Sequence, residues 1–331
     1  MRIAEISRAV TKALFAVGLA AGMVLAPSLS LAQTAAPAAA TVAAPAPAAS
    51  PAPVASTAAA DAYVPMRPTP GKGQPIPGAI GFQDQYSPIG KEALRMHDAL
   101  LMPIITVVSL LVLFLLIYVV GRFNRRANPV ASKTSHNTVI EVVWTLLPVL
   151  ILVVIAVPSI RLLAHQYKAP PKGALTVKVT GYQWYWGYTY PDNGGFEVIS
   201  NILPPGEATK HGEQEQLAVD NRMVVPAGED IRLQTTGSDV IHSFSVPSLW
   251  FKLDAVPGRI NEKVLHIDEP GVYYGQCTEL CGVRHGYMPI VVEALPRPKF
   301  EAWVKAQGGT VGAPASATPK TAAAAPAKTG A

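Results

Sequence analysis

The chain has 331 residues, of which 50% are hydrophobic, and its mean hydropathy is +0.26. This hydropathy is high for a soluble domain, so membrane-spanning segments are expected in addition to a folded core. The formal net charge of +5 would suggest a nucleic-acid partner if it were spread evenly, and two cysteines exclude a disulfide-dense scaffold.

The first 32 residues have the pattern of a secretory signal sequence. Arg2, Arg8 and Lys12 form a basic start, residues 13–26 are uncharged and mostly apolar, and small residues precede a cleavage point after Ala32. The alternative is a first membrane anchor. The apolar run is too short for that, because a hydrocarbon core of ~30 Å needs ~20 residues at a rise of ~1.5 Å each.

Residues 33–78 are rich in alanine and proline, and residues 33–60 contain no charge at all. Such a composition buries too little apolar surface to offset the entropy of ordering the chain. The sequence therefore predicts a disordered linker over 33–78. The similar composition of residues 306–331 predicts a disordered tail.

Residues 79–165 predict a hairpin of two transmembrane helices. Two charge-free runs, 99–120 and 142–160, are each long enough to span a membrane. The loop between them contains four basic residues and no acidic one, which indicates a cytoplasmic loop. The signal sequence gives the same topology. The expected location is the inner membrane of a bacterium, with both termini and the domain after the hairpin on the periplasmic side.

Glu141 lies at the start of the second predicted span. One interpretation is an interfacial carboxylate that the dipole of a helix N-terminus favours. The other is an acid at a cytoplasmic proton entrance, since ionisable groups near membrane spans often serve proton paths. The residue pattern leaves both open.

Residues 166–305 predict an external domain made of β-strands. Short alternating runs separated by Pro and Gly are typical of a β-sandwich or barrel. Residues 166–295 hold ten Lys and Arg against fifteen Asp and Glu, so this region is net negative by five charges. The basic residues lie elsewhere in the chain. This distribution favours a basic protein partner and argues against nucleic acid.

The stretch GYQWYWGYTY is expected to be one continuous strand, because its aromatic residues alternate with smaller ones. On such a strand, Gln183 and Tyr185 face one side. The other side then carries a row of aromatic residues: Tyr182, Trp184, Trp186, Tyr188 and Tyr190.

The only two cysteines lie in CTELCGVRHGYM, and their neighbours suggest a metal site. Thiolate, imidazole and thioether are the soft ligands that hold copper. A histidine at a predicted strand start completes a set of five: His242, Cys277, Cys281, His285 and Met288. The set has one thiolate too many for a mononuclear blue-copper site, but two thiolates could bridge two copper ions. A tetrahedral zinc site and a Cys277–Cys281 disulfide remain alternatives.

The stretch YYGQCTELCGVRHGYMPI resembles the dinuclear CuA loop of subunit II of haem–copper cytochrome c oxidases. The resemblance extends through GFQDQYSPI, GYQWYWGY, VDNRMVVP and DVIHSFSVPSLWFKLDAVPGR, over about two-thirds of the chain. It implies a mixed membrane protein, in which a two-helix transmembrane hairpin precedes an external all-β cupredoxin-like barrel. The implied function is to accept electrons from cytochrome c and pass them to haem in subunit I, where oxygen is reduced to water.

The same resemblance implies roles for individual residues. The five ligands hold two copper ions, and Glu279 adds its backbone carbonyl while its side chain binds a magnesium ion shared with subunit I. Trp184 receives the electron, and Asp220 and Asp239 belong to the surface that docks cytochrome c. Glu141 corresponds to an acid of the proton path. The implied partners are subunits I and III, cytochrome c and membrane lipid.

Three rival classes share part of this pattern. The subunit II of a quinol oxidase has the hairpin and barrel but lacks copper ligands. A copper chaperone has a Cys-x3-Cys pair but does not explain the aromatic stretch. A nitrous-oxide-reducing enzyme has a CuA loop but not this hairpin. No Cys-x-x-Cys-His occurs in the chain, so no attached haem c is expected.

Overall fold

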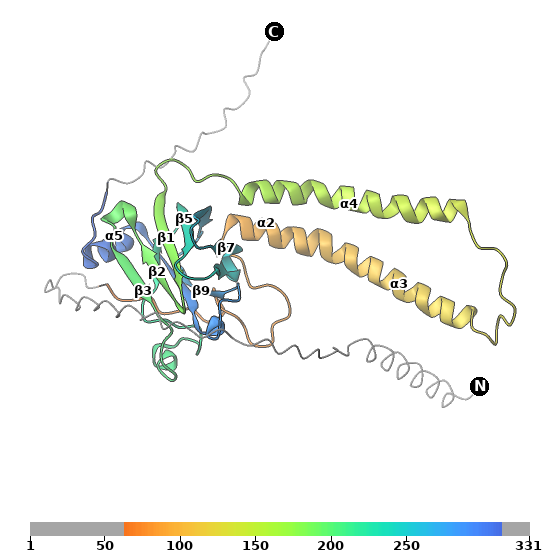
Figure 1. The fold of residues 1–331 in the computed structure, drawn as a ribbon, viewed down its shortest axis with the longest axis horizontal. Helices are drawn as coiled ribbons and strands as arrows, with labels where there is room; N and C mark the ends of the chain where they lie inside the picture. The colour runs from red at the N-terminus through yellow and green to blue at the C-terminus, as the bar shows by residue number, and fades with distance from the viewer. Residues whose placement is uncertain (1–62, 313–331) are drawn as a thin grey trace, which may run out of the picture. The chain divides into compact units, whose positions relative to one another are not determined.

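The computed structural model of this chain describes residues 63–312. The predicted signal sequence, most of the predicted linker and the last part of the predicted tail lie outside the described residues. Within them, two apolar helices precede a domain of β-strands (Figure 1), so the predicted fold class is confirmed.

The hairpin consists of two long apolar helices. The first runs through α2 (Pro88–Met96), the π-helical turn η1 (His97–Leu101) and α3 (Met102–Arg122), and the second is α4 (Thr138–Gln166). Both are long and apolar enough to cross a membrane, and none of the residues in their most apolar windows is buried. A core helix of a soluble protein would be buried there, so the exposed apolar surface suits contact with lipid.

The first helix begins well before the charge-free run. Ser87 caps it by accepting a hydrogen bond from the Gly90 backbone amide at 3.0 Å, and Pro88 occupies the first turn, where its missing N–H costs nothing. The backbone hydrogen-bond pattern changes to the wider π-helical form in η1, just before Pro103. Proline cannot donate a backbone hydrogen bond inside a continuing helix. The helix therefore extends beyond the predicted span on the side of the β domain.

Two five-stranded sheets form the β domain (Figure 1). The first has the order β3-β2-β1-β5-β8 and the second the order β4-β10-β9-β6-β7. The strands are β1 (Leu175–Tyr182), β2 (Tyr185–Thr189), β3 (Glu197–Ser200), β4 (Met223–Pro226), β5 (Asp230–Gly237), β6 (His242–Val246), β7 (Phe251–Ala255), β8 (Asn261–His266), β9 (Gly271–Cys277) and β10 (Pro289–Leu295). The pairs β1–β5 and β4–β10 are parallel, and the others are antiparallel.

A large apolar core joins the two sheets. Trp186 and Tyr188 from the first sheet and Phe244 from the second are fully buried in it, and the rings of Trp186 and Phe244 meet edge to face at 5.6 Å. The helix α5 (Arg297–Ala306) closes one end and buries Trp303. Cys277 and Cys281 belong to the same core, so the end of the sandwich that carries them is closely packed.

The aromatic stretch is a tight hairpin, and the prediction of one continuous strand is wrong. β1 ends at Tyr182, β2 begins at Tyr185, and these two residues face each other across a two-residue turn of Gln183 and Trp184. Alternation predicts a common face only while the strand continues. Tyr182 therefore stacks on Tyr185, with ring centroids 4.6 Å apart, while Trp186 points into the core on the opposite face.

The predicted linker is also wrong in its last part, because residues 63–78 pack against the β domain. The Tyr63 hydroxyl donates to Glu293 Oε2 at 2.7 Å, and the Tyr274 amide donates to the Gly73 carbonyl at 2.7 Å. The tail likewise begins later than predicted, since the Thr310 amide donates to the Asn193 carbonyl at 2.9 Å. Specific partners order both segments, although their composition predicted disorder.

Candidate metal centre

The five predicted ligands converge at one end of the second sheet. His242 opens β6 and Cys277 closes β9, and the pairing of Phe244 with Cys277 places these strand ends side by side. The loop after β9 carries Cys281, then His285 in a short 3-10 turn and Met288 immediately before β10. A strand end and a returning loop thus bring residues 46 positions apart into one cluster, because β9 is the antiparallel neighbour of both β6 and β10.

Cys281 lies at the middle of the cluster. Its Sγ is 3.9 Å from Cys277 Sγ, 3.6 Å from His285 Nδ1 and 3.5 Å from Met288 Sδ. The side-chain ligand atoms of His242, Cys277 and Cys281 all lie within 4.8 Å of one another, and these three residues are buried. The cluster therefore places two imidazoles, two thiols and a thioether around one small volume.

The sulfur distances exclude a disulfide in this structure. Both cysteines are free, and a disulfide would need its sulfurs about 2.05 Å apart. Met288 is 1% exposed, so its thioether faces the cluster and not the solvent. A thioether suits copper and adds nothing to a tetrahedral zinc site of cysteines and histidines, so the donor set fits copper better than zinc.

The His242 ring is oriented for a metal. Its Nε2–H donates to Asp239 Oδ1 at 2.9 Å, while the buried Nδ1 has no hydrogen-bond partner in the described part of the chain. A proton on Nε2 leaves the lone pair on Nδ1 free. Ligand histidines are typically held in this way by a carboxylate on the other ring nitrogen.

The two thiols differ in acidity although they are neighbours. Burial raises the pKa of both, but the adjacent His242 ring and hydrogen bonds with backbone groups lower the pKa of Cys277 below its ordinary value. The pKa of Cys281 stays raised, first by burial and then by the adjacent Cys277 thiolate. Two buried thiolates at this distance repel each other, so both ionise only when a cation lies between them.

Asp239 connects the metal cluster to the β1–β2 turn. Its Oδ1 accepts from His242, and its Oδ2 accepts from the Gln183 backbone amide at 2.8 Å. Burial opposes ionisation, but these hydrogen bonds lower the pKa of Asp239. Sequence analysis assigned this residue to the docking surface only. Its bridging position depends on the turn at Gln183, which the alternation pattern did not reveal.

Trp184 lies on the same turn, beside the metal loop. Its Nε1–H donates to the Cys281 carbonyl at 3.1 Å, and the Gln183 side-chain amide donates to the same oxygen at 3.1 Å. The Trp184 ring also covers Gly282, where an added Cβ would come within 2.9 Å of it. The indole is only half-buried, so it reaches both the solvent and the backbone of a cluster residue.

Comparison with known proteins identifies the family. The family model described as cytochrome c oxidase subunit II, periplasmic domain, matches residues 175–295, and the one described as its transmembrane domain matches residues 75–162. The probable cytochrome c oxidase subunit 2 of Rickettsia bellii is 50% identical over 231 residues, which cover 70% of this chain and 85% of that protein. The chain belongs to the cytochrome c oxidase subunit 2 family.

A second curated relative supports this assignment. Cytochrome c oxidase subunit 2 of Cereibacter sphaeroides is 40% identical over 255 residues, covering 72% of this chain and 84% of that protein. The crystal structure of the periplasmic domain of subunit II of cytochrome oxidase from Bradyrhizobium japonicum is 44% identical, with a TM-score of 0.38. It covers 42% of this chain and 97% of that one. The two family models and the two curated relatives confirm the predicted family.

Membership of the cytochrome c oxidase subunit 2 family settles two predictions. The β domain is cupredoxin-like, and a domain of this family implies copper of the CuA type, which the cluster of His242, Cys277 and Cys281 fits. The matched transmembrane domain and the two apolar helices make the chain a membrane protein with an external C-terminal domain.

The remaining predicted residues of this oxidase subunit occupy separate places. The Glu279 carbonyl accepts from Cys277 Sγ at 3.4 Å, so it lies beside the cluster, while its side chain is exposed. Asp220 is exposed and accepts from the Asn201 backbone amide at 2.7 Å. Glu141 is on the hairpin, where its Oε1 accepts from the Asn137 amide at 3.1 Å and so helps to cap α4.

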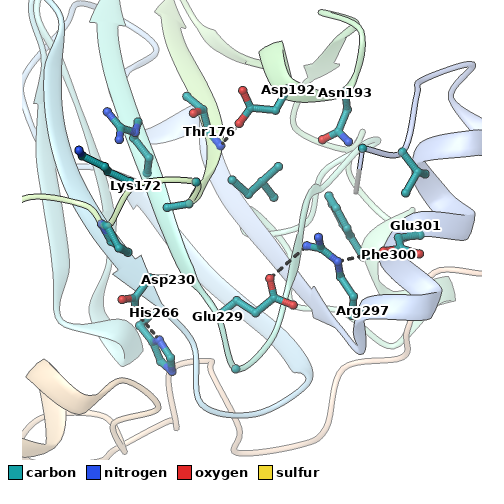
Figure 2. A pocket seen from close by; sticks show the side chains of 18 of the residues that line it. Lys172, Thr176, Asp192, Asn193, Glu229, Asp230, His266, Arg297, Phe300 and Glu301 are labelled. Atoms are coloured by element: carbon teal, nitrogen blue, oxygen red, sulfur yellow. Dashed lines mark hydrogen bonds and ion pairs between the residues drawn. The ribbon is translucent and has the colours of Figure 1, made fainter. Parts of the chain in front are cut away.

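A large groove at the other end of the β domain's first sheet from the metal ligands takes no part in the site. It has a volume of about 1070 Å³ and lies between the start of β1, the start of β5 and α5. Figure 2 shows that Arg297 lies between Glu229 and Glu301, which it contacts at 3.0 Å each, and that His266 contacts Asp230. None of the predicted ligands lines it.

Proposed function

We propose that this chain is the electron-accepting subunit of a respiratory oxidase, in which it receives electrons from cytochrome c and delivers them to haem in subunit I for the reduction of oxygen to water. One observation carries the proposal: five soft donors converge, with both thiols free and the His242 Nδ1 lone pair unpartnered. Such a donor set serves electron transfer rather than bond chemistry.

The chain's residues hold the proposed centre in a fixed geometry. His242, Cys277, Cys281, His285 and Met288 are its side-chain ligands, and Glu279 contributes its backbone carbonyl. Two copper ions held by these residues would supply a one-electron couple. The core packs His242 against the Trp186 ring at 5.9 Å, and the Trp186 Nε1–H holds the Met288 carbonyl at 3.1 Å. Ligands fixed in this way move little when an electron arrives or leaves.

Trp184 is the residue through which the electron arrives. Its exposed edge offers an apolar, polarisable contact to a docked protein, and its Nε1–H is bonded to the carbonyl of a ligand residue. A path from partner to centre therefore crosses one aromatic ring and one hydrogen bond. The acidic balance of the external domain supports a basic cytochrome c as the donor.

Asp220 and Asp239 belong to the docking surface in this proposal. Both carboxylates accept hydrogen bonds from nearby backbone amides, so their charges are held in place rather than free to swing. Fixed negative charge steers a basic partner toward Trp184 and raises the association rate at low ionic strength.

Further assignments follow from the same family membership. The exposed Glu279 side chain binds a magnesium ion at the contact with subunit I, and subunit III and membrane lipid complete the surroundings of the hairpin. Glu141 is the acid of a cytoplasmic proton path, in addition to capping α4. A signal sequence over residues 1–32 directs the external domain to the periplasmic side of a bacterial inner membrane.

Copper loading of the purified full-length chain tests the proposal. We expect two copper ions per chain and one unpaired electron delocalised over both, measured by metal analysis and electron paramagnetic resonance. Cys277→Ser should abolish the delocalised signal because one bridge is lost. His266→Gln, which removes an imidazole of the distant groove, should leave it intact. A single copper ion with an ordinary blue spectrum, or preferential zinc binding, would refute the dinuclear assignment.

A further inference from the structure

A cleft between the two helices lies at the end of the hairpin nearest the β domain. It has a volume of about 460 Å³ and is lined by α2 and α4. The ion pair between His165 Nδ1 and Glu92 Oε2, at 2.8 Å, ties the helices together beside it. Antiparallel helices joined at these two positions bring Arg95 and Arg161 to the same level.

The two arginines have no internal counter-charge. Neither Arg95 nor Arg161 makes an ion pair or side-chain hydrogen bond with residues 63–312, although both line the cleft. The other charged side chains there are already engaged: Lys91 binds Asp268 at 2.8 Å and Glu92 binds His165. The cleft therefore presents two guanidinium groups from different helices, and the one acid in its lining, Glu92, is paired with His165.

The depth of the cleft matches the boundary between hydrocarbon and water. Arg161 directly follows the charge-free run that ends at Ile160, and Arg95 lies four positions before the run that begins at Ala99. The cleft wall also contains the apolar side chains Met96, Pro158 and Leu162. Cationic groups above an apolar wall at this depth meet the phosphate and the upper acyl chain of a phospholipid.

We propose that this cleft binds the headgroup of an anionic phospholipid, with its phosphate between Arg95 and Arg161 and its glycerol and first methylenes against the apolar wall. Guanidinium groups bind phosphate oxygens through paired, charge-assisted hydrogen bonds, which a single exposed arginine reaching for the interface cannot provide. The site is independent of the copper centre and of which side of the membrane the β domain faces.

Native mass spectrometry of the purified oxidase complex containing this chain tests the site. The parent complex should retain one phosphatidylglycerol or cardiolipin molecule that the double variant Arg95→Gln/Arg161→Gln loses. The matched control, Arg125→Gln/Arg126→Gln, removes the same charge from the exposed loop at the opposite end of the hairpin and should retain the lipid. Arg161→Lys, which preserves charge and fold but not the paired geometry, should retain it only partly.

Three results would overturn the proposal. The first is an equal lipid count in the parent complex and the double variant. The second is displacement of the lipid by inorganic phosphate as readily as by added phosphatidylglycerol, because the apolar wall would then contribute nothing. The third is a double variant that keeps the lipid but loses another oxidase subunit, which would make the cleft a protein contact. Copper content should be unchanged in every variant, so failure here is distinguishable from failure of the proposed function.

Discussion

Removing the charge of Glu293 tests how the segment before the hairpin is held on the β domain. Glu293 lies on β10 and its side chain is fully buried. It accepts from the Tyr63 hydroxyl at 2.7 Å, the Met66 amide at 2.8 Å and Arg222 Nη1 at 2.8 Å, and Arg222 also binds Glu213 at 2.7 Å. One carboxylate thus satisfies three donors from two distant parts of the chain.

Glu293→Gln keeps the size of the side chain but removes its charge and turns one acceptor into a donor. Arg222, whose side chain is 9% exposed, would then pair with only one carboxylate, that of Glu213. Breaking a buried ion pair by removing one partner lowers the free energy of unfolding by about 3–5 kcal/mol. With a guanidinium slope of roughly 4 kcal/mol per molar for a domain of this size, the midpoint should fall by about 1 M.

Equilibrium unfolding of the copper-free full-length chain in detergent, followed by tryptophan emission, measures this change. The control is Glu262→Gln, which breaks the pair of Arg232 and Glu262 at 3.3 Å, where both side chains are 31% exposed. An exposed pair contributes about 0–1 kcal/mol, so the control should shift little. Equal shifts in the two variants would refute the reasoning. Hydrogen exchange at the Met66 amide should accelerate in Glu293→Gln alone.

Four further predictions concern the metal site and its surroundings. Asp239→Asn should weaken copper binding by about 10- to 100-fold, because it loosens the carboxylate that orients His242; a chelator competition with unchanged affinity would contradict this. Trp184→Phe should leave docking intact but slow electron transfer within the docked complex, and rapid-mixing kinetics at the parent rate would exclude the assigned role. Asp220→Asn should lower the association rate of cytochrome c and flatten its dependence on ionic strength, since salt screens charges beyond ~8 Å. Glu141→Gln keeps the oxygen that caps α4 but cannot take up or release a proton, so turnover should slow while copper content stays constant. Unchanged turnover at all pH values would leave only the capping role.

The sequence predicts those features whose signal is local. The spacing Cys-x3-Cys-x3-His-x2-Met places four donors in one loop, and a strand start is enough to propose His242 as the fifth. The spans are equally local, because a charge-free run long enough to cross hydrocarbon is read directly from composition. Both predictions agree with the positions of these residues in the structure.

The features that sequence analysis missed depend on distant partners or on weak turn signals. The reversal at Gln183 and Trp184 contains no glycine, proline or asparagine, so alternation continues through it unbroken. Tyr63 is ordered by Glu293, which lies 230 positions away, and the composition around Tyr63 does not predict this contact. The bridging role of Asp239 follows from that same turn, since its partner amide belongs to Gln183.

The turn and the metal loop behave as one unit because two small groups join them. The Asp239 carboxylate connects the Gln183 amide to the His242 ring, and the Cys281 carbonyl receives both the Gln183 and the Trp184 side chains. A displacement of the turn therefore moves hydrogen bonds to two ligand residues, one at the start of β6 and one in the loop after β9. The indole that meets the donor is thus held at a fixed distance from the centre by the groups that orient the ligands. For this reason Asp239→Asn should alter both copper affinity and the electron transfer that follows docking, whereas a purely steering carboxylate would alter only the association rate.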